Sequence, residues 1–210
     1  MNRQIRLAAL VAAFAVLSGC AQHPQVRVPP LLDLAGYGTI GVIEFSTDAE
    51  RDLGELATTR FLQAMQSAQS GVPVLELGSR DRVLDAIGHE ELDFEAVRAI
   101  GDRYHVDTLL VGKLDVTEVR PRFKLSTALD SLRVKAQVEA SLAVKLYAAD
   151  SGATRWTRSA RGAKTLAQVS VLAGGKPSVY ASDPEDAYSS LVAWLVNQVT
   201  EDLRPHYARR

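Results

Sequence analysis

LRVKAQVEASLAVKLYA, residues 132–148, is the stretch that decides the fold of this 210-residue chain. Every second residue from Leu132 to Ala148 is apolar, and most residues between them are polar or charged. Such alternation predicts a long β-strand with one buried face and one face in solvent. The turn residues Asp150-Ser151-Gly152 follow, and residues 154–160 alternate again. The sequence therefore predicts a β-hairpin whose second strand covers residues 154–160.

Strand and helix patterns alternate along the rest of the chain. Further strands are expected at residues 39–45, 72–77 and 107–119. Helices are expected at residues 48–69, after an N-cap at Ser79, at 94–104, and from Asp183-Pro184 to Pro205. The order β-α-β-α-α-β-β-β-α predicts a single α/β (α+β) domain, with a mixed sheet of about five strands covered by helices. Residues 109–111 are apolar on both faces, which is typical of a central strand.

Three glycines, Gly36, Gly38 and Gly41, have the G-x-G-x-x-G spacing of a dinucleotide-binding loop. That loop must follow a strand and open a helix, so that backbone N–H groups face the pyrophosphate. Here the apolar strand pattern begins at Ile40, after the first two glycines, and a Pro-rich stretch precedes them. The spacing therefore marks the start of the folded domain and does not indicate a nucleotide site.

The first twenty residues have the pattern of an export signal. Arg3 and Arg6 precede an apolar run from Leu7 to Leu17 that is too short to span a bilayer as a helix. The run ends in Leu17-Ser18-Gly19-Cys20, which resembles the bacterial lipobox, so Cys20 is the expected lipidation site, carrying diacylglycerol and a palmitate-type chain. Cys20 is the only cysteine of the chain, which removes disulfide pairing as its role. An ordinary signal peptide with a chance cysteine is the alternative.

Lipidation would anchor the chain to a membrane through two or three acyl chains. Ala21 follows the cysteine, and by resemblance to the sorting rule of enteric-type bacteria the destination is the inner leaflet of the outer membrane. We expect a signal peptide at 1–19, the lipidated cysteine and a flexible tether at 20–38, and a periplasmic domain at 39–206. Pro24, Pro29 and Pro30 favour an extended tether, although its leucines could instead dock on the domain or on a partner.

Composition and motifs argue against several classes of function. The formal net charge changes from −1 to −3 once Arg3 and Arg6 leave with the signal, and nucleic-acid binding would require a clustered basic patch. His89 lacks the second histidine that a helical zinc motif places four residues later, and no serine lies in a G-x-S-x-G motif. We therefore expect no enzyme activity, no metal, no cofactor and no small-molecule substrate.

Several stretches together suggest a family. TIGVIEF, RFLQAMQ, VPVLELGSRDRVLDAIG, AVRAIGDRYHVDTLLVGKLDVTEV and ASLAVKLYAADSGATRWTRSARG, within residues 39–162, resemble the periplasmic domain of CsgG-type curli-secretion lipoproteins. Lipoprotein activators of penicillin-binding proteins and the N-terminal domain of TolB are similar at a greater distance. The resemblance implies a non-enzymatic envelope lipoprotein that assembles with itself or docks on a protein partner.

The sequence departs from the secretion channel, which adds two membrane-crossing hairpins per subunit. Residues 120–131 and 166–182 stand in their place and are too short and too polar for such hairpins. An adaptor or assembly module of the periplasm is therefore the leading hypothesis. The alternatives are a subunit of an oligomeric secretion channel and an activator of a peptidoglycan synthase. The expected interaction face is the polar side of the long hairpin, with Lys135, Gln137, Glu139, Arg155 and Arg161, although one face of residues 132–148 could meet lipid instead.

Overall fold

The computed structural model describes residues 25–49, 52–125, 131–172, 178–181 and 183–209. The chain divides into two units, and residues 30–204 form the larger one. In the smaller unit, β1 (Gln25–Val28) pairs antiparallel with β9 (His206–Arg209), so that Val28 lies opposite His206. The larger unit holds every other helix and strand that the structure describes.

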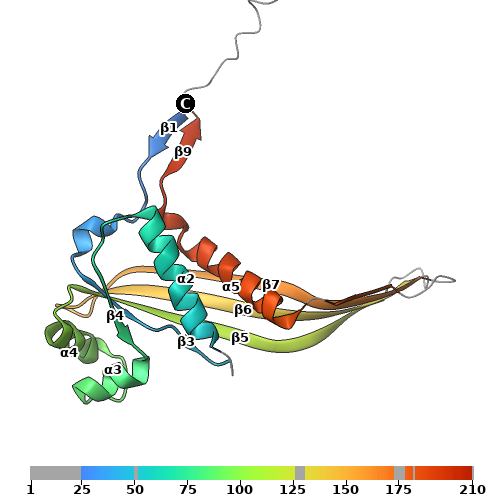
Figure 1. The fold of residues 1–210 in the computed structure, drawn as a ribbon, viewed down its shortest axis with the longest axis horizontal. Coiled ribbons are helices and arrows are strands. Elements are labelled where there is room, and N and C mark those ends of the chain that lie inside the picture. The colour runs from blue at the N-terminus through green and yellow to red at the C-terminus, as the bar shows by residue number, and fades with distance from the viewer. Residues whose placement is uncertain (1–24, 50–51, 126–130, 173–177, 182, 210) are drawn as a thin grey trace, which may run out of the picture. The chain divides into compact units, whose positions relative to one another are not determined.

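A mixed seven-stranded sheet forms the framework of the larger unit (Figure 1). Its strands are β2 (Ile40–Ile43), β3 (Ser46–Thr47), β4 (Val74–Gly78), β5 (Thr108–Leu125), β6 (Ser131–Ala148), β7 (Thr154–Leu172) and β8 (Ser178–Ala181). The strand order is β4-β2-β5-β6-β7-β8, and β3 pairs with β5. β2 is parallel to β4 and β5, whereas β5 to β8 are successively antiparallel. The predicted mixed sheet is confirmed, and Leu109 and Leu110 lie in a central strand as expected.

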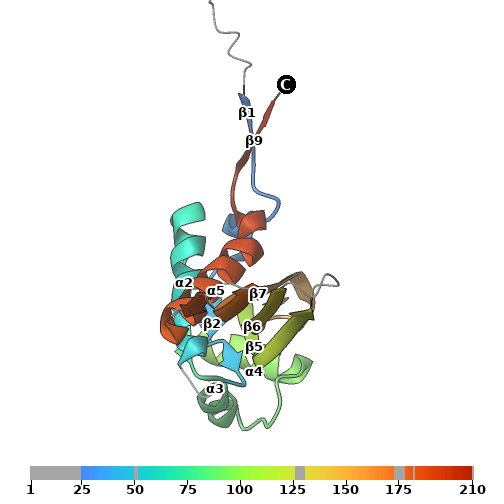
Figure 2. The ribbon, with the colours of Figure 1, turned by 90° about the vertical axis from the view of Figure 1, so that its right-hand side faces the viewer.

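Helices pack on both faces of this sheet. α2 (Leu53–Ala68) and α5 (Pro184–Val199) lie side by side over one face (Figures 1 and 2). They bury the apolar positions of β6 that the alternating sequence predicted, namely Val138, Ala140, Leu142, Val144 and Leu146. α3 (Arg80–Ile87) and α4 (Phe94–Tyr104) pack on the other face, over Leu109 and Tyr147. Within the described residues no helix is long and apolar enough to cross a bilayer.

Two strands are longer than the sequence predicted, and one strand was not predicted at all. β5 continues past Val119 to Leu125, β7 continues past Ala160 to Leu172, and β8 lies within residues 166–182. Their sequences alternate poorly, but backbone hydrogen bonding to a long neighbour does not require alternation. Residues 120–125 pair with residues 132–137 of β6, and residues 167–170 pair with β8. The length of β6 therefore sets the length of its neighbours.

Two predicted helix boundaries differ from those in the structure, the start of the first helix and the end of the last. α2 begins at Leu53 and not at Asp48, because the Asp48 carboxylate accepts a hydrogen bond from the N–H of Val116 at 2.9 Å, which ties residue 48 to β5. The last helix ends at Val199 and not at Pro205, since η2, a 3₁₀ turn at Glu201–Leu203, follows. Of the leucines in the predicted tether, Leu32 and Leu34 are buried in the core, whereas Leu31 is exposed.

Helix caps provide a first stability test. The Asp93 side chain accepts a hydrogen bond from the N–H of Ala96 at 2.8 Å, whereas Ser79, also at an N-cap position, makes no such bond. Asp93→Ala should lower the free energy of unfolding by about 1 kcal/mol, the usual value of a side-chain cap. Ser79→Ala should change it by clearly less, and chemical denaturation of both variants measures the difference. Equal losses would show that the Asp93 cap bond adds no stability.

Candidate functional site

The predicted interaction residues separate into two places in the structure. Gln137 and Glu139 of β6 lie opposite Thr165 and Ala163 of β7, and Ser141 lies opposite Arg161. Directly paired residues project to the same face of a sheet, so Gln137, Glu139 and Arg161 share one surface. Arg155 lies six residues before Arg161, about 20 Å along the strand.

Two of the sequence-based site predictions fall wholly or partly outside the described residues. Cys20 lies outside them altogether. The backbone of Lys135 is in β6 opposite Gln168, but its side chain is outside the described part of the molecule. Lipidation at Cys20 and the part played by Lys135 therefore stay predictions.

A broad part of the sheet around Glu139 and Arg161 is open to solvent. α3 and α4 cover only the end of the sheet near Leu109 and Tyr147. Beyond them, the side chains of alternate β7 residues are exposed. The β6 side chains on the same face are half-buried or exposed. We call this surface the open face; it consists of Lys113, Asp115, Gln137, Glu139, Ser141, Ala143, Lys145, Thr157, Ser159, Arg161 and Ala163.

Lys113 and Asp115 form an ion pair on the open face. The Lys113 ammonium and the Asp115 carboxylate are 2.6 Å apart, and both side chains are largely in solvent. The hydrogen bond to Asp115, together with its charge, raises the pKa of Lys113. The charges of this pair cancel each other. The other residues of the open face are polar or have small side chains, so the face holds no large apolar patch. Such a surface suits a reversible protein contact better than a permanent one.

The outer edge of β7 is the second notable feature. β8 pairs only with residues 167–170, and no described strand pairs with the outer side of residues 154–164. Unpaired strand edges can accept an added strand from another chain. The segment carries Arg155, Arg158, Arg161 and Lys164, and the sequence has no acidic residue from Ser151 to Ser182. Of the four, only Arg158 has a carboxylate partner among the described residues, in Glu201 and Asp202.

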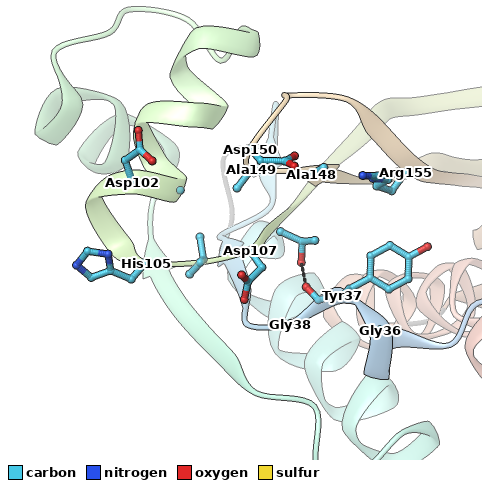
Figure 3. A pocket seen from close by; sticks show the side chains of 13 residues that line it. Gly36, Tyr37, Gly38, Asp102, His105, Asp107, Ala148, Ala149, Asp150 and Arg155 are labelled. Atoms are coloured by element: carbon cyan, nitrogen blue, oxygen red, sulfur yellow. Dashed lines mark hydrogen bonds between the residues drawn. The ribbon is translucent and has the colours of Figure 1, made fainter.

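A cavity of about 1160 Å³ lies where α4 ends and β5 begins (Figure 3). Asp102, Asp107 and Asp150 line it together with His105 and Arg155. The Asp107 carboxylate is already engaged, since it accepts a hydrogen bond from the N–H of Thr39 at 2.7 Å. In Figure 3 the side chain of His105 points away from the three carboxylates. The charged groups around this cavity therefore do not converge on one point.

The position of this cavity in the fold also differs from that of a typical ligand site. In sheets with parallel strands, ligands bind beyond the carboxyl ends of the strands. Here Gly38 and Asp107 precede the parallel strands β2 and β5, so the cavity lies at their amino ends. Among the described residues no three His, Cys, Asp or Glu side chains are close enough together to hold a metal ion. His105 follows α4 in a left-handed conformation, with φ 54°, directly after the helix that the sequence predicted at residues 94–104.

Sequence reasoning missed a groove between α2 and α5. It has a volume of about 280 Å³ and is lined by Arg60 and Arg204 among other polar residues. These arginines are 144 positions apart in the sequence, and neither belongs to a recognisable motif. Only the packing of α2 against α5 brings them together.

No protein-family model and no curated protein matches the chain. Among solved structures, the PelC dodecamer from Paraburkholderia phytofirmans is similar, with 15% identity, a TM-score of 0.42, and 86% of this chain and 95% of that chain covered. Lipoprotein GNA1162 from Neisseria meningitidis is similar with 17% identity, a TM-score of 0.38 and coverages of 78% and 98%. The LpoB C-terminal domain from Salmonella enterica is similar with 11% identity, a TM-score of 0.36 and coverages of 73% and 93%.

These comparisons bear on the resemblance only at a coarse level. Bacterial lipoproteins are among the similar structures, as the sequence led us to expect. At such TM-scores and identities, the likeness assigns no function to this chain. The finer resemblance to the CsgG type stays a prediction.

Proposed function

We propose that this chain is a non-enzymatic lipoprotein of the outer membrane, held in the inner leaflet through Cys20, and that its domain is an adaptor or assembly module in the periplasm. The observation that carries the proposal is the open face of β5 to β7 beside the unpaired edge of β7. A polar surface with an available strand edge can receive another protein. The scattered carboxylates around the large cavity offer no comparable arrangement for catalysis.

The charge of the β7 edge favours one kind of contact. Arg155, Arg161 and Lys164 are exposed and have no carboxylate partner among the described residues. Charges at the rim of an interface mainly accelerate association and select the partner. We infer that the partner presents acidic side chains to this edge.

Photo-crosslinking tests the docking surface. A photoreactive phenylalanine analogue at Ser159, on the open face, should form a discrete crosslinked product in cells. The same analogue at Thr59, which is exposed on α2, serves as the matched control. Arg155→Glu together with Arg161→Glu should reduce the Ser159 product at least about fivefold, because each reversal replaces attraction by repulsion. Equal crosslinking at Ser159 and Thr59, or no effect of the charge reversals, would contradict the proposed docking surface.

The native mass of the mature lipoprotein in mild detergent distinguishes the forms of the proposal. A monomer or small oligomer, with Cys20→Ala released as a soluble folded domain, is expected of an anchored adaptor. A discrete ring-sized oligomer would replace the adaptor by a channel subunit. Identification of a peptidoglycan synthase in the Ser159 product would assign the adaptor to activation of that enzyme.

A further inference from the structure

The groove between α2 and α5 lies on the helix layer, which covers the opposite side of the sheet from the open face. Arg60, Gln63, Ala64 and Ser67 of α2 line one wall. Ala193, Val196 and Asn197 of α5 line the other, and Arg204 follows η2 at one end. The side chains of Ala64, Ser67 and Ala193 are short, which leaves space between the helices. Cationic and amide groups border that space.

The two arginines of this groove lack the usual partners of a guanidinium. Arg60 donates from Nη2 to Ser189 Oγ at 2.7 Å. Arg204 donates from Nη2 to Thr200 Oγ1 at 2.8 Å and from Nη1 to Asn197 Oδ1. All three acceptors are neutral oxygens, and each guanidinium has five N–H donors. Both side chains therefore retain an uncompensated charge and free donors within the described structure.

Arg158 shows how an arginine beside α5 is compensated in the same molecule. Its guanidinium lies 3.2 Å from the carboxylate of Glu201 and 3.2 Å from that of Asp202. These two acidic residues directly precede Leu203 and Arg204, yet they pair with Arg158 and not with Arg204. The charges of Arg60 and Arg204 are thus left available to a ligand, although carboxylates are close by in the sequence.

The spacing of the two guanidiniums follows from their anchors on α5. Ser189 holds Arg60, and Asn197 holds Arg204. Eight residues of α-helix separate these anchors, which corresponds to about 12 Å. One small anion can therefore contact one guanidinium, whereas a linear ligand can reach both. Arginine binds phosphate and carboxylate through paired N–H donors, so both anions suit these ends.

We propose that the α2–α5 groove binds a linear ligand that carries two phosphate or carboxylate groups about 12 Å apart. Arg60 binds one group and Arg204 the other. Gln63, Ser67 and Asn197 line the intervening space and offer hydrogen bonds to the chain that connects the two groups. This site does not depend on the adaptor function, because it uses neither the open face nor the edge of β7.

Calorimetric titration of the mature lipoprotein in non-ionic detergent tests the site. The probes are linear pentapolyphosphate and orthophosphate, compared at equal ionic strength. Pentapolyphosphate should bind at least about tenfold more tightly, because only the longer probe reaches both arginines. Arg60→Gln together with Arg204→Gln should abolish this preference. Arg158→Gln is the matched control and should preserve it, since Arg158 is already compensated by carboxylates.

Further arms separate the possible outcomes. Diphosphoryl lipid A, whose headgroup carries a phosphate at each end of a disaccharide, displaces pentapolyphosphate from the micelles if lipid headgroups are the source of the anions, and a soluble anion is the source if it does not. Thermal unfolding of each variant confirms that the fold is retained. Equal affinity for the two probes, or an unchanged preference in the double variant, overturns the proposal. Loss of the preference in Arg158→Gln, without loss of the fold, would also overturn it.

Discussion

Gln69→Leu is expected to lower the free energy of unfolding by about 4 kcal/mol, because three backbone groups lose their hydrogen-bond partner at once. Gln69 follows the last turn of α2. Its amide Nε2 donates to the carbonyl oxygens of Leu32 and Leu203 at 2.6 and 3.0 Å, and its Oε1 accepts from the N–H of Leu34 at 2.7 Å. One side chain thus joins α2 to the segment before β2 and to η2.

Equilibrium denaturation of the Gln69→Leu variant measures this loss. Gln66→Leu is the matched control, since Gln66 is exposed on the same helix, and its stability should stay within about 0.5 kcal/mol of the parent. The Gln69 variant should also show faster amide exchange at Leu34, whose N–H loses its acceptor. A stability loss below about 1 kcal/mol would mean that water replaces the amide. The three Gln69 hydrogen bonds, which we call the clamp at Gln69, would then not hold these segments together.

Gly112→Ala is expected to cost about 3 kcal/mol, because its methyl group has no space. A Cβ at residue 112 would lie 2.4 Å from the ring of Phe45. Phe45 is only 2% exposed, and its ring lies 5.4 Å from that of Phe61, which is fully buried. The Phe45 ring therefore cannot move away without displacing the core between β5 and α2.

A double-mutant cycle identifies the cause of the loss. Phe45→Leu replaces the ring by a smaller side chain, so the combined variant Phe45→Leu with Gly112→Ala should lose at least about 1 kcal/mol less than the sum of the single losses. Gly36→Ala is the control, because no atom beyond its two chain neighbours lies within 4 Å of its added Cβ. It should leave the midpoint of urea denaturation unchanged. Additive losses in the cycle would show that a contact other than Phe45 limits residue 112.

The expected interaction face was only partly predictable from the sequence. Alternation placed Gln137, Glu139 and Arg161 on the solvent side of the hairpin, because a strand has a fixed period of two. It could not show that α3 and α4 leave this region uncovered, since that depends on where their helices pack. Nor could it show that β8 pairs with only residues 167–170 and leaves the outer edge of residues 154–164 unpaired among the described strands.

The sequence by itself determined the properties that depend on residues close in the chain. These include the buried face of β6, the helix at Phe94–Tyr104, the Asp183 N-cap of α5 and the expectation of lipidation at Cys20. Periodicity and helix capping are local signals, so a single sequence is enough to predict the strands and helices that they specify.

Only the tertiary structure decided features built from distant residues. Residues 120–125 and 167–172 became strands because neighbouring strands supply their hydrogen bonds. The clamp at Gln69 and the arginine groove join positions more than thirty residues apart in the sequence. Their geometry follows from how α2 and α5 pack on the sheet, and that packing is a property of the whole core and not of any single segment.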